Sequence, residues 1–141
     1  SITNAICFSP DGKTAYFADT AAKILYRVAL DDDGWPAGEP EVFKDFTEEG
    51  LNPDGAVVDS EGYLWSANWG ASRVVRYDPD GRFVEEISFP ARQTSCPAFG
   101  GPDMQTLYVT SAAVNLSGDG EGKTYAAQVS VRGQSEHRVI I

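Results

Sequence analysis

Two side chains that carry oxygen donors occupy the same place in two similar segments of the chain. Asn4 comes just before the apolar residues 5–8, and Asp54 comes just before residues 56–58, at an offset of 50 residues. Ser95 opens a third such segment. An amide carbonyl and a carboxylate are ligands that Ca²⁺, Mg²⁺ and Mn²⁺ prefer in proteins. If the three positions meet in the fold, the sequence offers part of a cation site.

Asparagine and aspartate also serve a simpler purpose at such places. Both start turns through hydrogen bonds from the side chain to the backbone, and Asn4 and Asp54 stand directly before strand-like runs. From the residues alone, the cation site and the pair of turn residues remain equally open. The choice depends on the elements that position the two side chains.

An internal repeat supplies these elements. At the offset of 50 residues, Phe8 corresponds to Val58 and Gly12 to Gly62, and a third copy begins at Ser95. Each copy is a series of short alternating runs separated by glycine turns, a pattern that predicts antiparallel strands. Repeats of about 40–50 residues with four strands each indicate a β-propeller. We therefore predict an all-β fold, a β-propeller of four-stranded antiparallel blades.

The repeats divide the chain into about three blades, at residues 1–46, 52–89 and 95–141. The last strand of the third blade is expected at residues 138–141. Because propellers typically have about 4–8 blades, three blades cannot close a ring. We therefore expect one partial propeller domain that lacks the N-terminal half of the ring.

In a propeller, the innermost strand of each blade lines the central channel. Asn4, Asp54 and Ser95 each open an innermost strand, so we expect them to converge at one mouth of this channel. Trp69 has no counterpart in the other repeats, and we expect it at the rim of the same pocket.

The overall composition excludes some classes of partner. The chain of 141 residues is 42% hydrophobic and 23% charged, as in ordinary globular domains, and its formal net charge is −10. Nucleic acid and anionic membranes both require a basic face, so neither is expected as a partner.

No stretch is long and apolar enough to span a membrane, and no signal peptide precedes Ser1, so we expect a cytoplasmic protein. The two cysteines, Cys7 and Cys96, lie in non-neighbouring blades, and no disulfide is expected between them.

Motifs for nucleophilic and nucleotide chemistry are missing from the sequence. It has no Gly-x-Ser-x-Gly motif, no phosphate-binding loop, no dinucleotide fingerprint and no Cys/His zinc cluster. Its single histidine, His137, lies near the end without ligand-type neighbours, so catalysis by a serine–histidine pair is unsupported.

Several ordered motifs carry a family resemblance. The segments FSPDGKTAYFADT, NPDGAVVDSEGYLW, WGASRVVRYDPDGR and TSCPAFGGPDMQTLYVTSA resemble the C-terminal half of the regucalcin/gluconolactonase (senescence marker protein) family. The resemblance covers nearly the whole chain and weakens after about Val114. It implies a propeller of about six blades, roughly twice as long as this chain. It also implies one divalent cation on the axis and the hydrolysis of sugar lactones.

The resemblance assigns roles to individual residues. It implies that Asn4 and Asp54 are metal ligands and that Asp54 is the base for the attacking water. The family's third protein ligand is a glutamate near the N-terminus of the full-length chains, which nothing here matches. Ser95 and Trp69 are our candidates for contacts to the substrate. The cation would be Ca²⁺, or Zn²⁺, Mg²⁺ or Mn²⁺.

These observations lead to one hypothesis and two alternatives. The hypothesis is a metal-dependent hydrolase that opens sugar lactones, with water attacking a cation-polarised carbonyl; this chain alone is expected to be inactive. One alternative is a calcium-binding or scaffold propeller without catalysis. The other is a related propeller hydrolase that acts on aryl esters or organophosphates. The sequence identifies neither the lactone nor the physiological metal.

Overall fold

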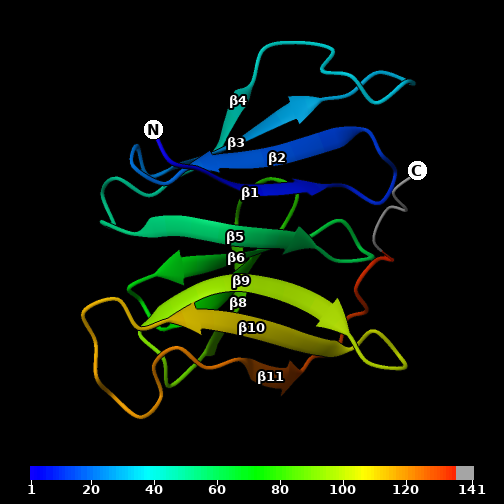
Figure 1. Ribbon diagram of the computed structural model, residues 1–141. Coiled ribbons are helices and arrows are strands. Elements are labelled where there is room, and N and C mark those ends of the chain that lie inside the picture. Colours follow the sequence, from blue (N-terminus) through cyan, green and yellow to red (C-terminus); the bar gives the residue numbers. More distant parts are fainter. Residues whose placement is uncertain (136–141) are drawn as a thin grey trace, which may run out of the picture.

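The computed structural model describes residues 1–135. The secondary-structure elements in this range are all β-strands. The strands form three antiparallel sheets that follow one another along the chain (Figure 1). Within each sheet the strands are hydrogen-bonded in sequence order, as in the blades of a propeller. The all-β propeller fold predicted from the repeats is confirmed. The strand predicted at residues 138–141, like His137, lies outside the described residues.

The first blade has four strands that pair in order. Its β2 and β3 remain in register over their whole length, so paired side chains share a face of the sheet. The strands are β1 (Thr3–Phe8), β2 (Thr14–Asp19), β3 (Ile24–Ala29) and β4 (Glu41–Asp45).

The second blade repeats this arrangement. The last residue of β6 is Trp69, which pairs with Asn52 at the start of β5. The strands are β5 (Asn52–Val58), β6 (Leu64–Trp69), β7 (Arg73–Tyr77) and β8 (Phe83–Ser88).

The third blade has three strands within the described residues, where four are predicted for a complete blade. They are β9 (Gln93–Gly100), β10 (Thr106–Ala112) and β11 (Tyr125–Gln128). After β11 the chain leaves the sheet as a strap, residues 129–135, that runs back to the other blades. The side-chain amide of Gln134 in this strap donates a hydrogen bond of 2.7 Å to the carbonyl of Phe8, at the far end of β1.

The turn between β5 and β6 shows how the repeats fold locally. One carboxylate oxygen of Asp59 accepts hydrogen bonds of 3.0 Å from the backbone N–H groups of Glu61 and Tyr63. The other accepts hydrogen bonds from the Trp65 indole and from Arg76, 2.9 Å each. Because every lone pair of this fully buried carboxylate has a partner, the turn is held without an unsatisfied charge.

Two apolar cores lie between the blades. The core between the first and second blades is centred on Leu25, Phe46 and Val58, and the core between the second and third on Trp65 and Leu107. Full burial of such a side chain contributes about 1.5–3 kcal/mol. Face-to-face packing of the sheets therefore fixes how the blades sit beside one another.

The innermost strands β1, β5 and β9 lie side by side and run in the same direction (Figure 1). Their first residues are therefore at the same end of the molecule, as expected for strands around a channel. A cavity of about 350 Å³ extends along these strands and is lined by residues that include Ile6, Val57 and Pro97. In residues 1–135 no helix long and apolar enough to cross a membrane is found.

Candidate functional site

Asn4 and Asp54 meet at the start of the inner strands. The Asn4 side-chain nitrogen donates a hydrogen bond of 2.5 Å to Oδ1 of Asp54, and both side chains are partly buried. The two residues are 50 positions apart and come from neighbouring blades. The structure thus brings together the two side chains that the repeat alignment places at equivalent positions.

Irregularities in both strands aim these side chains. The pairing of β1 with β2 shifts between Asn4 and Cys7, and that of β5 with β6 shifts between Pro53 and Ala56. A bulge of this kind turns a side chain away from the regular alternation of a strand. In β1 the bulge places Ala5 at φ 57°, a left-handed conformation that costs a non-glycine residue about 1–2 kcal/mol. The chain therefore holds a strained backbone directly beside Asn4.

Gly55, the residue after Asp54, lets the strands approach closely. A Cβ atom at Gly55 would lie 2.7 Å from the carbonyl oxygen of Ser95 and 2.8 Å from Cα of Cys96. Real Cβ atoms essentially never come this close to another backbone. The contact between β5 and β9 at this end of the channel therefore requires glycine.

The Asp54 carboxylate is half-buried without a cationic partner. Burial raises the pKa of the Asp54 carboxyl above its ordinary value, and hydrogen bonds from the Asn4 amide and the Gly55 N–H offset part of the rise. No ion pair recorded within residues 1–135 includes Asp54. A bound cation beside this carboxylate would compensate the cost of burying its charge.

The donor chemistry fits part of a cation site. The Asp54 carboxylate and the Asn4 amide oxygen are hard donors of the kind that Ca²⁺, Mg²⁺ and Mn²⁺ bind. In the described part of the chain, no three His, Cys, Asp or Glu side chains are grouped to hold a metal. Since Ca²⁺ takes about 6–8 oxygen ligands, the two residues could hold a cation only together with further donors.

Ser95 and Trp69 lie at the same end of the molecule as Asn4 and Asp54. The hydroxyl of Ser95 lies 2.8 Å from the hydroxyl of Thr110 on β10, and no hydrogen bond joins it to Asn4 or Asp54. Trp69 is partly exposed at the end of β6. Both are thus near the mouth and outside the Asn4–Asp54 pair.

Thr20 belongs to the site and was missed in the sequence. It follows β2, and its hydroxyl donates a hydrogen bond of 2.6 Å to the carbonyl of Pro53 while lying 3.5 Å from the Asn4 side-chain nitrogen. The sequence offers only an Asp-Thr pair of turn composition here. No spacing rule indicates that this turn reaches across to the neighbouring blade.

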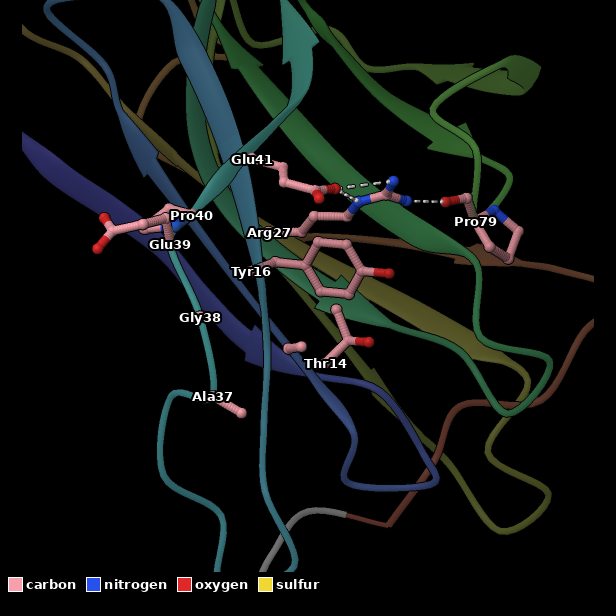
Figure 2. A pocket seen from close by; sticks show the side chains of 10 residues that line it. Thr14, Tyr16, Arg27, Ala37, Gly38, Glu39, Pro40, Glu41 and Pro79 are labelled. Carbon is pink, nitrogen blue, oxygen red and sulfur yellow. Dashed lines mark hydrogen bonds and ion pairs between the residues drawn. The ribbon is translucent and has the colours of Figure 1, made fainter.

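A pocket larger than the cavity along the inner strands lies elsewhere. It encloses about 620 Å³ at the outer side of the first two blades, and its lining includes Tyr16, Arg27, Glu41 and Pro79 (Figure 2). Arg27 is already bound, because its guanidinium donates to the Glu41 carboxylate at 3.3 Å and to the Pro79 carbonyl at 3.0 Å. This pocket therefore presents no unpaired cationic group to a ligand, and Asn4 and Asp54 remain the stronger candidate.

The chain is similar in sequence to proteins named as lactonases and regucalcins. The sequence profile of the SMP-30/Gluconolactonase/LRE-like region matches residues 1–113. The chain is 41% identical to the 6-deoxy-6-sulfogluconolactonase of Pseudomonas putida, over 96% of this chain and 48% of that protein. It is 43% identical to the L-arabinolactonase of Azospirillum brasilense, over 84% and 39%.

A solved structure agrees with the fold. The calcium-binding protein regucalcin of Agrobacterium tumefaciens superposes with a TM-score of 0.90 and 46% identity, over 96% of this chain and 48% of that one. Almost all of this chain is matched in these comparisons, but it spans only about half the length of the relatives. The match of the profile to most of the chain confirms the resemblance carried by the sequence motifs. The chain belongs to the SMP-30/gluconolactonase/LRE-like family.

Proposed function

We propose that the complete protein hydrolyses sugar lactones at a divalent-cation site to which this chain contributes Asn4 and Asp54. The observation that carries the proposal is the contact between these two oxygen-bearing side chains from neighbouring blades. The reaction class is supported by relatives named for the hydrolysis of sulfogluconolactone and arabinolactone.

The proposed roles follow from the chemistry of the two side chains. A divalent cation bound there would polarise the lactone carbonyl and make water more acidic. Asp54 holds the cation and accepts the proton of the attacking water. The water oxygen bonds to the carbonyl carbon, the ring carbon–oxygen bond breaks, and the ring oxygen takes up a proton to become a hydroxyl. Asn4 orients Asp54 through their hydrogen bond and offers its amide oxygen as a second donor.

Ser95 and Trp69 are proposed as substrate contacts because of their position in the fold. Ser95 opens β9, and Trp69 ends the strand that pairs with the start of β5, so both stand at the end of the molecule that holds Asp54. A hydroxyl and an indole ring suit a sugar, which offers hydroxyl groups and an apolar ring face. We assign them to substrate binding.

The remaining donors and substrate contacts are assigned to the other half of the propeller. Relatives are about twice as long as this chain, and three blades leave the channel open on one side. A glutamate from the preceding blades would complete the ligand set. The chain by itself would then bind cations weakly and turn over little or no lactone.

Which cation is used depends on the complete ligand set. The oxygen donors favour Ca²⁺, Mg²⁺ or Mn²⁺, and Zn²⁺ also accepts carboxylate oxygen. We also propose a cytoplasmic location for the protein.

A second candidate function is calcium binding without catalysis. It is favoured by the Agrobacterium structure, which is described as a calcium-binding protein. Such a protein would bind Ca²⁺ at Asn4 and Asp54 and leave lactones intact. Titration with Ca²⁺ beside a lactone assay separates the two candidates, since only the hydrolase gives a signal in both.

The proposed function is tested on the complete protein with a panel of five- and six-membered aldonolactones. We expect hydrolysis to stop after chelation and to return with Mn²⁺ or Ca²⁺. Asp54→Ala should lower kcat/KM by about 10²–10⁴-fold, the usual contribution of a general base. Asp78→Asn is the matched control, because Asp78 is a carboxylate of the turn after β7, outside the site. Normal turnover by Asp54→Ala would contradict the proposal.

A further inference from the structure

Thr20 lies in the turn between β2 and β3 and is held there by two backbone hydrogen bonds. Its backbone N–H donates a hydrogen bond of 2.9 Å to the carbonyl of Ile2, and its carbonyl accepts one of 3.2 Å from Lys23. The first bond holds Thr20 beside Ile2, which directly precedes β1 and lies two residues before Asn4. The second closes the turn that leads into β3. The position of the Thr20 hydroxyl is therefore set by the backbone on both sides.

The Thr20 hydroxyl connects two blades. It donates its single proton to the carbonyl of Pro53, at 2.6 Å. Pro53 is buried, and its carbonyl belongs to the peptide bond that leads into Asp54. A hydroxyl has one proton and two lone pairs, so toward any other neighbour Thr20 can only accept.

This restriction determines the orientation of the Asn4 amide. The Asn4 side-chain nitrogen, a donor, lies 3.5 Å from the Thr20 oxygen and 2.5 Å from Asp54 Oδ1. Its two N–H groups can thus serve two acceptors. The amide oxygen, which is the donor proposed for the cation, accepts a hydrogen bond of 3.2 Å from the N–H of Ala5. An amide turned by 180° would place oxygen against two acceptors, which is unfavourable.

We propose that Thr20 is a positioning residue, which sets the distance between the Asn4 and Asp54 strands and the orientation of the Asn4 amide. The inference rests on the proposed function in that the pair it positions is the proposed cation site. Thr20 touches neither substrate nor cation in this role. It acts through Pro53 and Asn4, as the outer partners of metal ligands do in other proteins.

Two substitutions isolate the hydroxyl. Thr20→Val keeps the shape of the side chain and removes the hydrogen bonds, and Thr20→Ser keeps the hydroxyl. Thr94→Val is the matched control, because the Thr94 hydroxyl also reaches across to the neighbouring blade, where it lies 2.9 Å from the carbonyl of Arg73 and 3.2 Å from that of Asn68 and donates its single proton. This control removes an interblade hydrogen bond in which neither Asn4 nor Asp54 takes part.

The first measurement is the dissociation constant for Mn²⁺, by calorimetric titration of the complete protein. We expect Thr20→Val to weaken Mn²⁺ binding by about 10–100-fold, the usual effect of losing an outer partner of a metal ligand. Thr20→Ser should restore most of the affinity, and Thr94→Val should bind as the wild type does. Equal affinity of wild type and Thr20→Val overturns the proposal, as does an equal loss in the valine and serine variants.

The second measurement needs no metal. In ¹⁵N-correlated NMR spectra of the metal-free protein, the side-chain amide of Asn4 should shift and exchange faster with water in Thr20→Val, while Thr20→Ser and Thr94→Val leave it in place. An unchanged Asn4 signal in Thr20→Val contradicts the positioning role. If the wild type binds no Mn²⁺ but Thr20→Val still changes the Asn4 signal, the proposed function is contradicted and the role of Thr20 remains supported.

Discussion

At the scale of the residue, the candidate site depends on a position without a side chain. Gly55 lies between Asp54 and the rest of β5, and its backbone touches that of Ser95 and Cys96. Its φ is not in the left-handed region, so the requirement for glycine is one of space and not of conformation. The closeness of β5 and β9 at the mouth therefore depends on one missing methyl group.

We expect Gly55→Ala to push β5 away from β9. The added Cβ would meet two backbones that cannot move independently of their sheets, and overpacking of this kind costs about 1–3 kcal/mol. The free energy of unfolding, measured in urea, should fall by this amount. Gly38→Ala is the control, because no atom lies within 4 Å of its added Cβ. If both variants unfold at the same urea concentration, the close approach at Gly55 does not exist in solution.

The residues of the site were only partly predictable. Asn4 and Asp54 were found because the repeat places them at equivalent positions and a propeller brings such positions together. Thr20 was missed because its hydrogen bond to Pro53 crosses between blades, over 33 positions. Gly55 was missed because close backbone contact leaves no pattern in the sequence.

At the scale of the element, the turns are held by aspartates that bind backbone N–H groups. Asp78 accepts hydrogen bonds of 2.9 Å from the N–H groups of Asp80 and Arg82. Asp45 accepts one of 2.8 Å from the N–H of Thr47 and one of 2.7 Å from its hydroxyl. These bonds lower the pKa of Asp78, chiefly through Arg82, and the pKa of Asp45, chiefly through the Thr47 side chain. The turns are therefore strongest when these carboxylates are ionised.

This arrangement predicts how stability changes with pH. A carboxyl whose pKa is lower in the folded than in the unfolded state stabilises the fold above the unfolded pKa, about 3.9 for aspartate. That stabilisation is lost as the pH falls through the folded pKa. The urea midpoint should drop between about pH 5 and pH 3, and less steeply in the double variant Asp45→Asn, Asp78→Asn. A double variant with an unchanged pH slope would show that these turns carry no such linkage.

The elements themselves were largely predictable, with exceptions near the C-terminus. Alternating apolar residues and glycine turns indicated the strands of the first two blades, because these strands have one face in a core. In the third blade, β11 is short and ends at Gln128. The following residues leave the sheet because Val131 packs into the core between blades and Gly133 presses against Phe99. These are tertiary contacts, which the alternation of apolar and polar residues along a strand cannot reveal.

At the scale of the whole molecule, the first blade has an open apolar face. Phe17 pairs with Tyr26 and Tyr26 with Val42, so the three side chains form a row on one side of the sheet. The rings of Phe17 and Tyr26 stack at 5.2 Å, and Val42 is 56% exposed. The opposite side of the same strands carries Tyr16 and Phe43, which pack against the second blade. The exposed row therefore lies where the preceding blade of a complete ring would pack.

We expect this face to make the 141-residue chain associate when it is produced alone. Apolar side chains that a neighbouring blade would cover are exposed, and such patches drive association. In size-exclusion chromatography with light scattering, the apparent mass should rise with concentration, and Val42→Lys should reduce the rise. Trp35→Lys is the control, since Trp35 is 71% exposed in the β3–β4 loop and outside the row. In the complete protein Val42→Lys should instead lower the free energy of unfolding, because there the charge would be buried between two blades. A complete protein indifferent to Val42→Lys would mean that no blade covers this face.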